Sequence, residues 1–308
     1  MTDPLAHQAS TRDLCARLRM RLSTPLTRFA PAPTGLLHLG HVANAIYVWG
    51  LAAAVGGRVL LRVEDHDRQR CRPVYERALL DDLDWLGFAP DVYPTDAFRA
   101  GVCHGRQSDR DAVYWSALAS LAGHGRLYGC DCTRKQLGDD PYPGTCRDRG
   151  LPLREGIGWR VRIEPGSEWF DDGLLGPQEQ CPAQQCGDML VRDRHGNWTY
   201  QWAVSVDDAA QGVTLVVRGR DLLESTGRQI QLARIIGRAQ PPAFAHHPLI
   251  MKSATQKLSK SDDDTGIRAL RAAGWSAART IGHAAYLVGL TPAGRALDAR
   301  DVRSVFLP

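Results

Sequence analysis

The distribution of hydrophobic and polar positions in the first quarter of the chain predicts a strand, a loop, a helix and a second strand. Two prolines and a glycine exclude regular structure between the first strand and the helix. The helix is rich in Ala and Leu and ends at Gly56-Gly57, which is a typical helix stop. The predicted elements are a strand over 27–29, a loop over 30–35, a helix over 42–55 and a strand over 58–63. This order requires a parallel sheet, and such sheets bind ligands at the carboxyl ends of their strands.

The rest of the chain predicts further helices and strands, separated by one segment of different amino-acid composition. Residues 126–186 are rich in Cys, Gly and Pro and contain only short apolar segments, which indicates an insertion. The other predicted elements are helices over 73–87, 109–125, 225–236 and 269–290, a hairpin or pair of strands over 191–194 and 198–206, and a strand over 213–218. The predicted domains are an N-terminal extension that is expected to be flexible (1–24), two halves of one α/β domain (25–125 and 187–252), the insertion between them, and a lysine loop with a short helical segment (253–308).

Composition narrows the class of protein. With 44% hydrophobic and 23% charged residues, the 308-residue chain is expected to be globular, not disordered, collagen-like or coiled-coil. No apolar run approaches the roughly 18–20 residues that cross a bilayer, and the N-terminus lacks the apolar core of a secretory signal, so we expect a cytoplasmic protein with no membrane partner. A net charge of +4 is too small for bulk binding of nucleic acid but leaves a local RNA contact open. The eight cysteines need no disulfide framework in that compartment, so a cluster among them favours metal binding.

Two short motifs, more than 200 residues apart, carry the candidate chemistry. His38-x-Gly40-His41 stands at the start of a predicted helix, where free N–H groups and the helix dipole favour a triphosphate, and the glycine allows close approach. The second motif, Lys-Leu-Ser-Lys-Ser over residues 257–261, would supply cations that reach phosphoryl oxygens. Either motif alone would more often be a chance pair of histidines or a solvated loop. Their occurrence in this order, on both sides of a parallel-sheet pattern, favours a nucleotide site.

Together these motifs resemble those of the class I aminoacyl-tRNA synthetases, and the surrounding sequence is similar to the glutamyl subgroup. The resemblance covers about residues 27–261 and rests on four separated blocks in the same order. The blocks are 28–41, from Arg-Phe-Ala-Pro to His-x-Gly-His; 62–67, Arg-Val-Glu-Asp-x-Asp, followed by Arg68 or Arg70; 207–222, from Asp-Asp to Gly-x-Asp-Leu; and the lysine motif. The resemblance implies an α/β fold, a Rossmann-like parallel-sheet catalytic domain that carries a cysteine-containing, zinc-type insertion.

A glutamate substrate needs a cation for its side-chain carboxylate and an acceptor for its ammonium group. Arg218, at the end of a buried strand, suits the first role through its bidentate fork, and Glu64 suits the second. Taken singly, an arginine here would be a structural ion pair and Tyr200 a core aromatic. The resemblance implies that glutamate is bound by Arg28, Phe29, Ala30, Pro31, Ala32, Glu64, Tyr200 and Arg218. It also implies that ATP, with Mg²⁺, is bound by His38, Gly40, His41, Lys257 and Lys260, of which His38, His41 and Lys260 are catalytic.

The insertion contains a candidate metal site. Cys130, Cys132 and Cys146 offer three thiolates, and Zn²⁺ favours four tetrahedral ligands with sulfur prominent. Chemistry alone favours Cys181, Cys186 or His124 as the fourth ligand, because an unperturbed tyrosine has a pKa of about 10. The resemblance instead implies Tyr142 as the fourth ligand, since short glutamyl-synthetase-like proteins carry a Cys-x-Cys, Tyr-x-x-x-Cys arrangement. It also implies that the site holds one structural zinc. The alternative is a set of buried or free thiols.

The C-terminal end distinguishes members of the family. Glutamyl enzymes continue after the lysine loop into a long anticodon-binding region, whereas a short helical segment follows Ser261 here. The resemblance is therefore to the truncated paralogues, which activate glutamate with ATP without tRNA and esterify it to the queuosine base at the wobble position of tRNA(Asp). We expect such a protein to be a monomer. The alternatives are an enzyme that charges a tRNA 3′ end, a nucleotidyltransferase of the same superfamily, and a non-catalytic RNA-binding relic.

Overall fold

The structure, a computed structural model of the 308-residue chain, describes residues 4–122, 125–138, 141–251 and 266–307. The strands are β1 (Leu26–Phe29), β2 (Arg58–Leu61), β3 (Leu127–Cys130), β4 (Gly158–Val161), β5 (Glu168–Asp172), β6 (Gly176–Gln180), β7 (Met189–Arg192), β8 (Leu215–Gly219) and β9 (Ala243–His247). The α-helices are α1 (Pro4–Arg21), α2 (Leu39–Val55), α3 (Pro73–Leu86), α4 (Thr95–Arg99), α5 (Asp111–Ala122), α6 (Arg134–Leu137), α7 (Pro182–Gln185), α8 (Tyr200–Ala210), α9 (Thr226–Ile235), α10 (Ile267–Ala272) and α11 (Ala277–Leu287). Within the described ranges, no helix is both long enough and apolar enough to cross a membrane.

Parallel strands form the centre of the molecule, as the sequence predicts. β1 pairs in parallel with β2, with Leu26 opposite Arg58, and β8 pairs in parallel with β9, with Leu215 opposite Ala243. The two pairs lie side by side, because the amide of Thr214 donates to the carbonyl of Leu26 over 2.9 Å. The carboxyl ends of β1, β2, β8 and β9 therefore meet at one edge, which is where the functional site lies.

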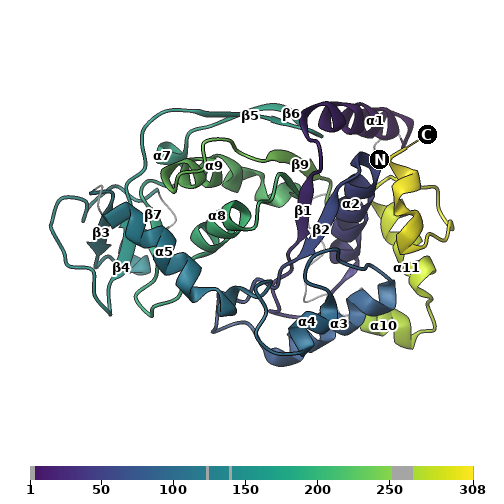
Figure 1. Cartoon of the computed structure of the whole chain (residues 1–308), viewed down its shortest axis with the longest axis horizontal. Coiled ribbons are helices and arrows are strands. Elements are labelled where there is room, and N and C mark those ends of the chain that lie inside the picture. The colour runs from purple at the N-terminus through teal and green to yellow at the C-terminus, as the bar shows by residue number, and fades with distance from the viewer. Residues whose placement is uncertain (1–3, 123–124, 139–140, 252–265, 308) are drawn as a thin grey trace.

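α2 crosses between β1 and β2 and is covered on its outer side by α1, α11 and the C-terminal 3₁₀ helix Ala299–Val305 (Figure 1). The contact with the C-terminal segment is close, since a Cβ at Gly50 would lie 2.1 Å from the ring of Phe306. The N-terminal residues that are predicted to be flexible form α1 instead. Leu14 and Leu18 of α1 are buried in the main core, so their apolar contacts hold this helix against α2.

The predicted insertion does not form one separate unit. β3, β4 and β7 make an antiparallel sheet that lies at the end of the molecule opposite α11 (Figure 1). Between β4 and β7, however, the chain returns to the central part: β5 and β6 form a hairpin, and Asp172 of β5 pairs in parallel with Phe244 of β9. The segment predicted as an insertion therefore also extends the central sheet, and this brings Asp172 close to the functional site.

Two predicted elements are wrong in type or continuity. The segment 198–206 was predicted as a strand, but residues 200–210 form α8, which is buried from Trp202 to Asp208. The apolar run 202–204 favours a strand, and the polar residues that recur at helical spacing, Gln201, Ser205 and Asp208, are themselves largely buried, so they do not mark a solvent-exposed face. The predicted helix 269–290 is two helices, because Gly274 adopts a φ of 78° after α10 and Ser276 caps the start of α11.

Candidate active site

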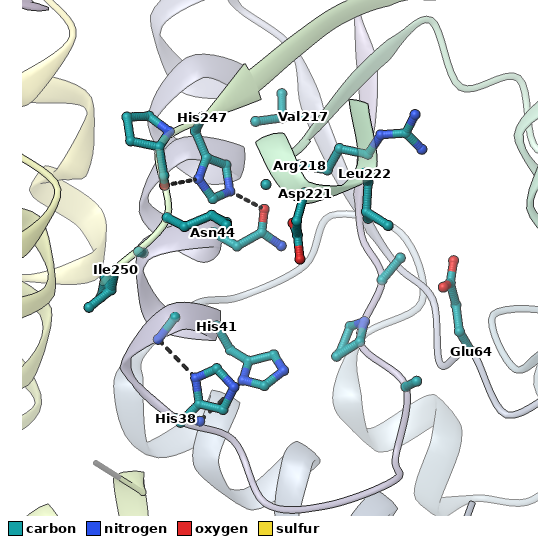
Figure 2. Close-up of a pocket in the computed structure, with 18 of the residues that line it drawn as sticks. His38, His41, Asn44, Glu64, Val217, Arg218, Asp221, Leu222, His247 and Ile250 are labelled. Carbon is teal, nitrogen blue, oxygen red and sulfur yellow. Dashed lines mark hydrogen bonds between the residues drawn. The ribbon is translucent and has the colours of Figure 1, made fainter. Parts of the chain in front are cut away.

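A cavity of about 450 Å³ lies at the carboxyl ends of the parallel strands and at the first turn of α2 (Figure 2). The predicted residues that line it are Arg28, Ala30, Pro31, Ala32, His38, Gly40, His41, Glu64, Tyr200 and Arg218. Asn44, Asp221, His247 and Ile250 are among the other lining residues. Phe29 does not line the cavity, because its ring is buried in the core 5.3 Å from that of Trp49. Lys257 and Lys260 lie outside the described residues.

The two histidines of the first motif cap α2. His38 Nδ1 accepts a hydrogen bond from the amide of Gly40 over 3.0 Å, and His41 Nδ1 accepts one from the amide of His38 over 3.1 Å. A neutral imidazole that accepts at Nδ1 carries its proton on Nε2, so both rings are N–H donors. Only glycine fits between them, because a Cβ at Gly40 would lie 2.8 Å from the ring of His38. The motif thus fixes the position and the tautomer of two donors at a helix N-terminus, where anions bind.

Arg218, on β8, is a buried cation with neutral partners. Its Nε donates to His246 Nε2 over 2.9 Å, and its two terminal nitrogens donate to Gln229 Oε1 over 2.7 Å and Thr226 Oγ1 over 2.9 Å. Among the described residues, no carboxylate lies within ion-pair distance of it. Burial lowers the pKa of Arg218, but a guanidinium remains charged in proteins. The terminal nitrogens carry four N–H groups, so two of them are available to a ligand in the cavity.

Arg28, the other arginine predicted to bind glutamate, is already paired with a carboxylate. Arg28 Nε donates to Asp208 Oδ1 over 3.1 Å, and the fully buried Arg62 donates to the same oxygen over 2.7 Å. Burial alone would raise the pKa of Asp208, but Arg28 and Arg62 hold it below its ordinary value. Arg62 also donates to Glu64 Oε1, whereas Glu64 Oε2 receives no hydrogen bond from the described residues. Glu64 therefore retains an acceptor oxygen at the cavity.

The polar residues that were not predicted include Asn44, Asp221 and His247, which line the cavity, and His246, which contacts Arg218. His247 is buried, its ring nitrogens lie 3.1 Å from Asn44 Oδ1 and 2.8 Å from the carbonyl of Pro248, and burial lowers its pKa to about 4 (Figure 2). His246 and His247 end a strand that the sequence analysis did not identify. Two histidines after the short apolar stretch 243–245 are the signal that could have located them.

The predicted metal ligands come together between β3 and the loop after α6. The Sγ atoms of Cys130, Cys132 and Cys146 all lie within 4.8 Å of one another, with Cys132 and Cys146 3.5 Å apart. Tyr142 Oη lies 3.6 Å from Cys130 Sγ and accepts a hydrogen bond from the amide of Cys146. A tetrahedral zinc with Zn–S bonds of about 2.3 Å separates its sulfurs by about 3.8 Å, so these donors fit a metal ion.

The other candidate fourth ligands are not in this cluster. Cys181 and Cys186 flank the short helix α7, and Cys181 Sγ lies 3.3 Å from Ser167 Oγ. His124 lies outside the described residues. Of the candidate fourth ligands that the structure describes, Tyr142 alone lies at the cluster, beside the thiol of Cys130 and the amide of Cys146.

Comparisons with known proteins agree with this geometry. The family of catalytic domains of class I tRNA synthetases (E and Q) matches residues 26–141 and 158–297. A glutamyl-Q tRNA(Asp) synthetase from Nitratidesulfovibrio vulgaris is 43% identical over 284 residues, which cover 86% of both chains. A protein of the same name from Symbiobacterium thermophilum is 41% identical over 301 residues, which cover 91% of both chains.

Solved structures with the same fold are longer. A glutamate tRNA ligase from Elizabethkingia meningosepticum, in complex with its amino acid, superposes with a TM-score of 0.74 at 25% identity. The match covers 91% of this chain but 64% of that ligase. The glutamate-tRNA synthetase of Elizabethkingia anophelis gives a TM-score of 0.75, again at 25% identity.

Proposed function

This chain belongs to the class I tRNA synthetases (E and Q), a family of ligases, and we propose that it activates L-glutamate with ATP and transfers it to the queuosine base at the wobble position of tRNA(Asp). The activation step proceeds without tRNA. The names of relatives that are 41–43% identical over most of both chains support the choice of acceptor. The site chemistry supports the choice of amino acid.

The observation that carries the choice of glutamate is the charge of Arg218. A buried cation without a carboxylate among its described partners is costly unless a ligand supplies the counter-charge. The side-chain carboxylate of glutamate supplies it through a bidentate pair with the two remaining N–H groups. A neutral glutamine side chain would leave the cation uncompensated, so the same residue gives selectivity for glutamate over glutamine.

The remaining cavity residues complete the amino-acid site. Glu64 Oε2 accepts from the ammonium group of glutamate, and Tyr200 and the segment 30–32 close the cavity around the substrate. Arg28 acts here chiefly by holding Asp208 and lining the wall, since its charge is already paired. Phe29 contributes through the core, where it fixes the start of this segment.

The ATP site lies at the first turn of α2. The Nε2–H groups of His38 and His41 donate to phosphoryl oxygens, and Gly40 allows the nucleotide close approach. Lys257 and Lys260 are proposed to complete this site from outside the described residues. Bound Mg²⁺ would neutralise charge on the triphosphate. An oxygen of the glutamate α-carboxylate attacks the α-phosphorus, the bond to the bridging oxygen breaks, and pyrophosphate leaves.

The second step needs no protein nucleophile. A hydroxyl of the acceptor attacks the carbonyl carbon of the mixed anhydride, the bond to the phosphate oxygen breaks, an ester forms, and AMP and the hydroxyl proton are released. Positioning and electrostatic stabilisation by the residues of this cavity supply the catalysis. ATP–pyrophosphate exchange tests the first step: we expect glutamate-dependent exchange in the absence of tRNA, and exchange that requires tRNA or ignores glutamate would contradict the proposal.

A second candidate acceptor is the 3′ end of a tRNA. The superposition on a glutamate tRNA ligase and a glutamate-tRNA synthetase is the observation that favours it. The two acceptors differ in whether queuosine is needed, and the labelled-glutamate measurement described below separates them.

We propose that Cys130, Cys132, Cys146 and Tyr142 hold one structural Zn²⁺. Replacing Cys132 by Ser should lower the bound zinc of the purified protein from about one equivalent to well below half, because a thiolate ligand is lost. Elemental analysis measures the zinc. The matched control is Cys181→Ser, which removes a thiol outside the cluster and should leave the zinc content unchanged. Equal zinc in both variants would contradict the assignment.

A further inference from the structure

We propose that Asp172 and His246 are positioning residues that orient the guanidinium of Arg218 and hold it ready for the substrate carboxylate. This inference rests on the proposed role of Arg218 in binding glutamate. It concerns two residues that come from separate strands, β5 and β9, and that do not line the cavity.

The hydrogen-bond chain has a single allowed proton arrangement. Arg218 Nε can only donate, so His246 Nε2, which lies 2.9 Å away, must accept. The proton of a neutral His246 is therefore on Nδ1, and that group donates to Asp172 Oδ2 over 2.5 Å. All three side chains are almost entirely buried: Arg218 is 3% exposed, and Asp172 and His246 are 0% exposed. Solvent is thus excluded from the hydrogen bonds that join Asp172, His246 and Arg218.

Asp172 is itself held in place by the backbone. Its Oδ1 accepts from the amides of Leu174 and Leu175, each over 3.0 Å, and from the amide of His246 over 3.2 Å. These bonds hold Oδ1 toward the backbone, so Oδ2 faces the imidazole. Burial alone would raise the pKa of Asp172, but the bond from His246 holds it below its ordinary value, so the carboxylate stays ionised.

The hydrogen bonds from Asp172 through His246 fix the rotation of the Arg218 guanidinium about its long axis. Gln229 and Thr226 each accept one N–H of the terminal nitrogens, and the bond from Nε to His246 completes the set that orients the guanidinium and leaves two N–H groups for the substrate. The charged groups that face His246 are Asp172, Arg218 and Arg28. A protonated His246 would place a second cation next to Arg218. Burial, together with Arg218 and Arg28, lowers the pKa of His246, although Asp172 acts in the opposite direction. The neutral acceptor form is thereby maintained.

A purely structural role, in which His246 merely links β5 to β9 through Asp172, makes the opposite prediction for two conservative variants. The amide of His246→Asn reaches the position of Nδ1, so it can donate to Asp172 but offers no acceptor to Arg218. The amide of His246→Gln reaches the position of Nε2, so it can accept from Arg218 but loses the bond to Asp172. Positioning requires the second contact, and a structural link requires the first.

Asp172→Asn provides a further test that leaves the backbone bonds intact. The three amides require an oxygen at the Oδ1 position, so the NH₂ group of the new side chain faces His246 Nδ1. His246 must then carry its proton on Nε2, where it meets the N–H of Arg218 as a second donor. The variant therefore reverses the tautomer without removing the imidazole.

Steady-state ATP–pyrophosphate exchange with varied glutamate and with varied ATP measures the effect. For His246→Asn and Asp172→Asn we expect the KM for glutamate to rise about 10- to 100-fold, with the KM for ATP unchanged, because a hydrogen bond to a charged group is lost. For His246→Gln we expect a KM for glutamate within about threefold of the wild-type value, since the acceptor is kept. A glutamate KM that rises in His246→Gln but not in His246→Asn would overturn the inference.

The failure of this inference is distinguishable from that of the proposed function. If the wild-type protein shows no glutamate-dependent exchange, the proposed function fails. If the wild-type protein is active and Asp172→Asn, shown by circular dichroism to be folded, retains the wild-type KM for glutamate, the positioning role alone is wrong.

Discussion

Replacing Arg218 by Gln should raise the KM for glutamate in ATP–pyrophosphate exchange by about 10²-fold to several thousand-fold, because removing one partner of a buried charge pair costs about 3–5 kcal/mol. The substitution keeps a long polar side chain and removes the charge that the substrate carboxylate meets. The KM for ATP should change little, since the triphosphate is bound at the first turn of α2 and not at Arg218.

Arg234→Gln is the matched control for this variant. Arg234 lies on α9 and pairs with Glu168 over 2.8 Å, and its side chain is 56% exposed and does not line the cavity. The pair lies outside the cavity, so this variant should retain the wild-type KM for both substrates even though Glu168, which is buried, loses its partner. Equal glutamate KM values in Arg218→Gln and Arg234→Gln would show that Arg218 does not bind the substrate.

Replacing His38 by Asn should lower the turnover of exchange by about 10²–10³-fold, which is the effect of removing one preorganised donor to a charged transition state. Asn is among the best N-cap residues, and its side-chain oxygen can accept from the amide of Gly40 as His38 Nδ1 does. The variant therefore keeps the cap of α2 and loses the Nε2–H donor.

His38→Ala separates the two contributions of this residue. It removes the cap as well as the donor, so its melting temperature should fall below that of His38→Asn, whereas both variants should be similarly inactive. Thermal unfolding and exchange are measured on the same preparations. Wild-type turnover in a folded His38→Asn would contradict the assignment of His38 to catalysis.

The parts of the site that could be predicted from the sequence are local in the chain. His38, Gly40 and His41 act within one helical turn, and their chemistry follows from their spacing at a helix start. The carboxyl ends of β1 and β2 were also predictable, because a strand, a helix and a strand in succession require a parallel pair. The strand pattern places Arg28 and Glu64 near these ends, and the family resemblance implies their role in the site.

The parts that could not be predicted depend on contacts between distant residues. Asp172 and His246 are 74 positions apart, and Asp172 stands in a segment that the composition indicates is an insertion. Nothing local predicts that β5 joins β9. The helix α8 was missed for a different reason: its polar residues recur at helical spacing but are largely buried, and its apolar run 202–204 favours a strand. It carries Tyr200 to the cavity and Asp208 to Arg28.

The central claim is that glutamate is transferred to queuosine in tRNA(Asp). Labelled glutamate, ATP and the protein are incubated with total tRNA from queuosine-replete cells and, in parallel, from queuosine-deficient cells, and the labelled tRNA is identified. The account predicts label on tRNA(Asp) from the replete cells alone, and label that nuclease digestion recovers on the modified wobble nucleoside and not on the 3′-terminal adenosine. Equal labelling of both tRNA pools, or label on a tRNA 3′ end, would contradict it.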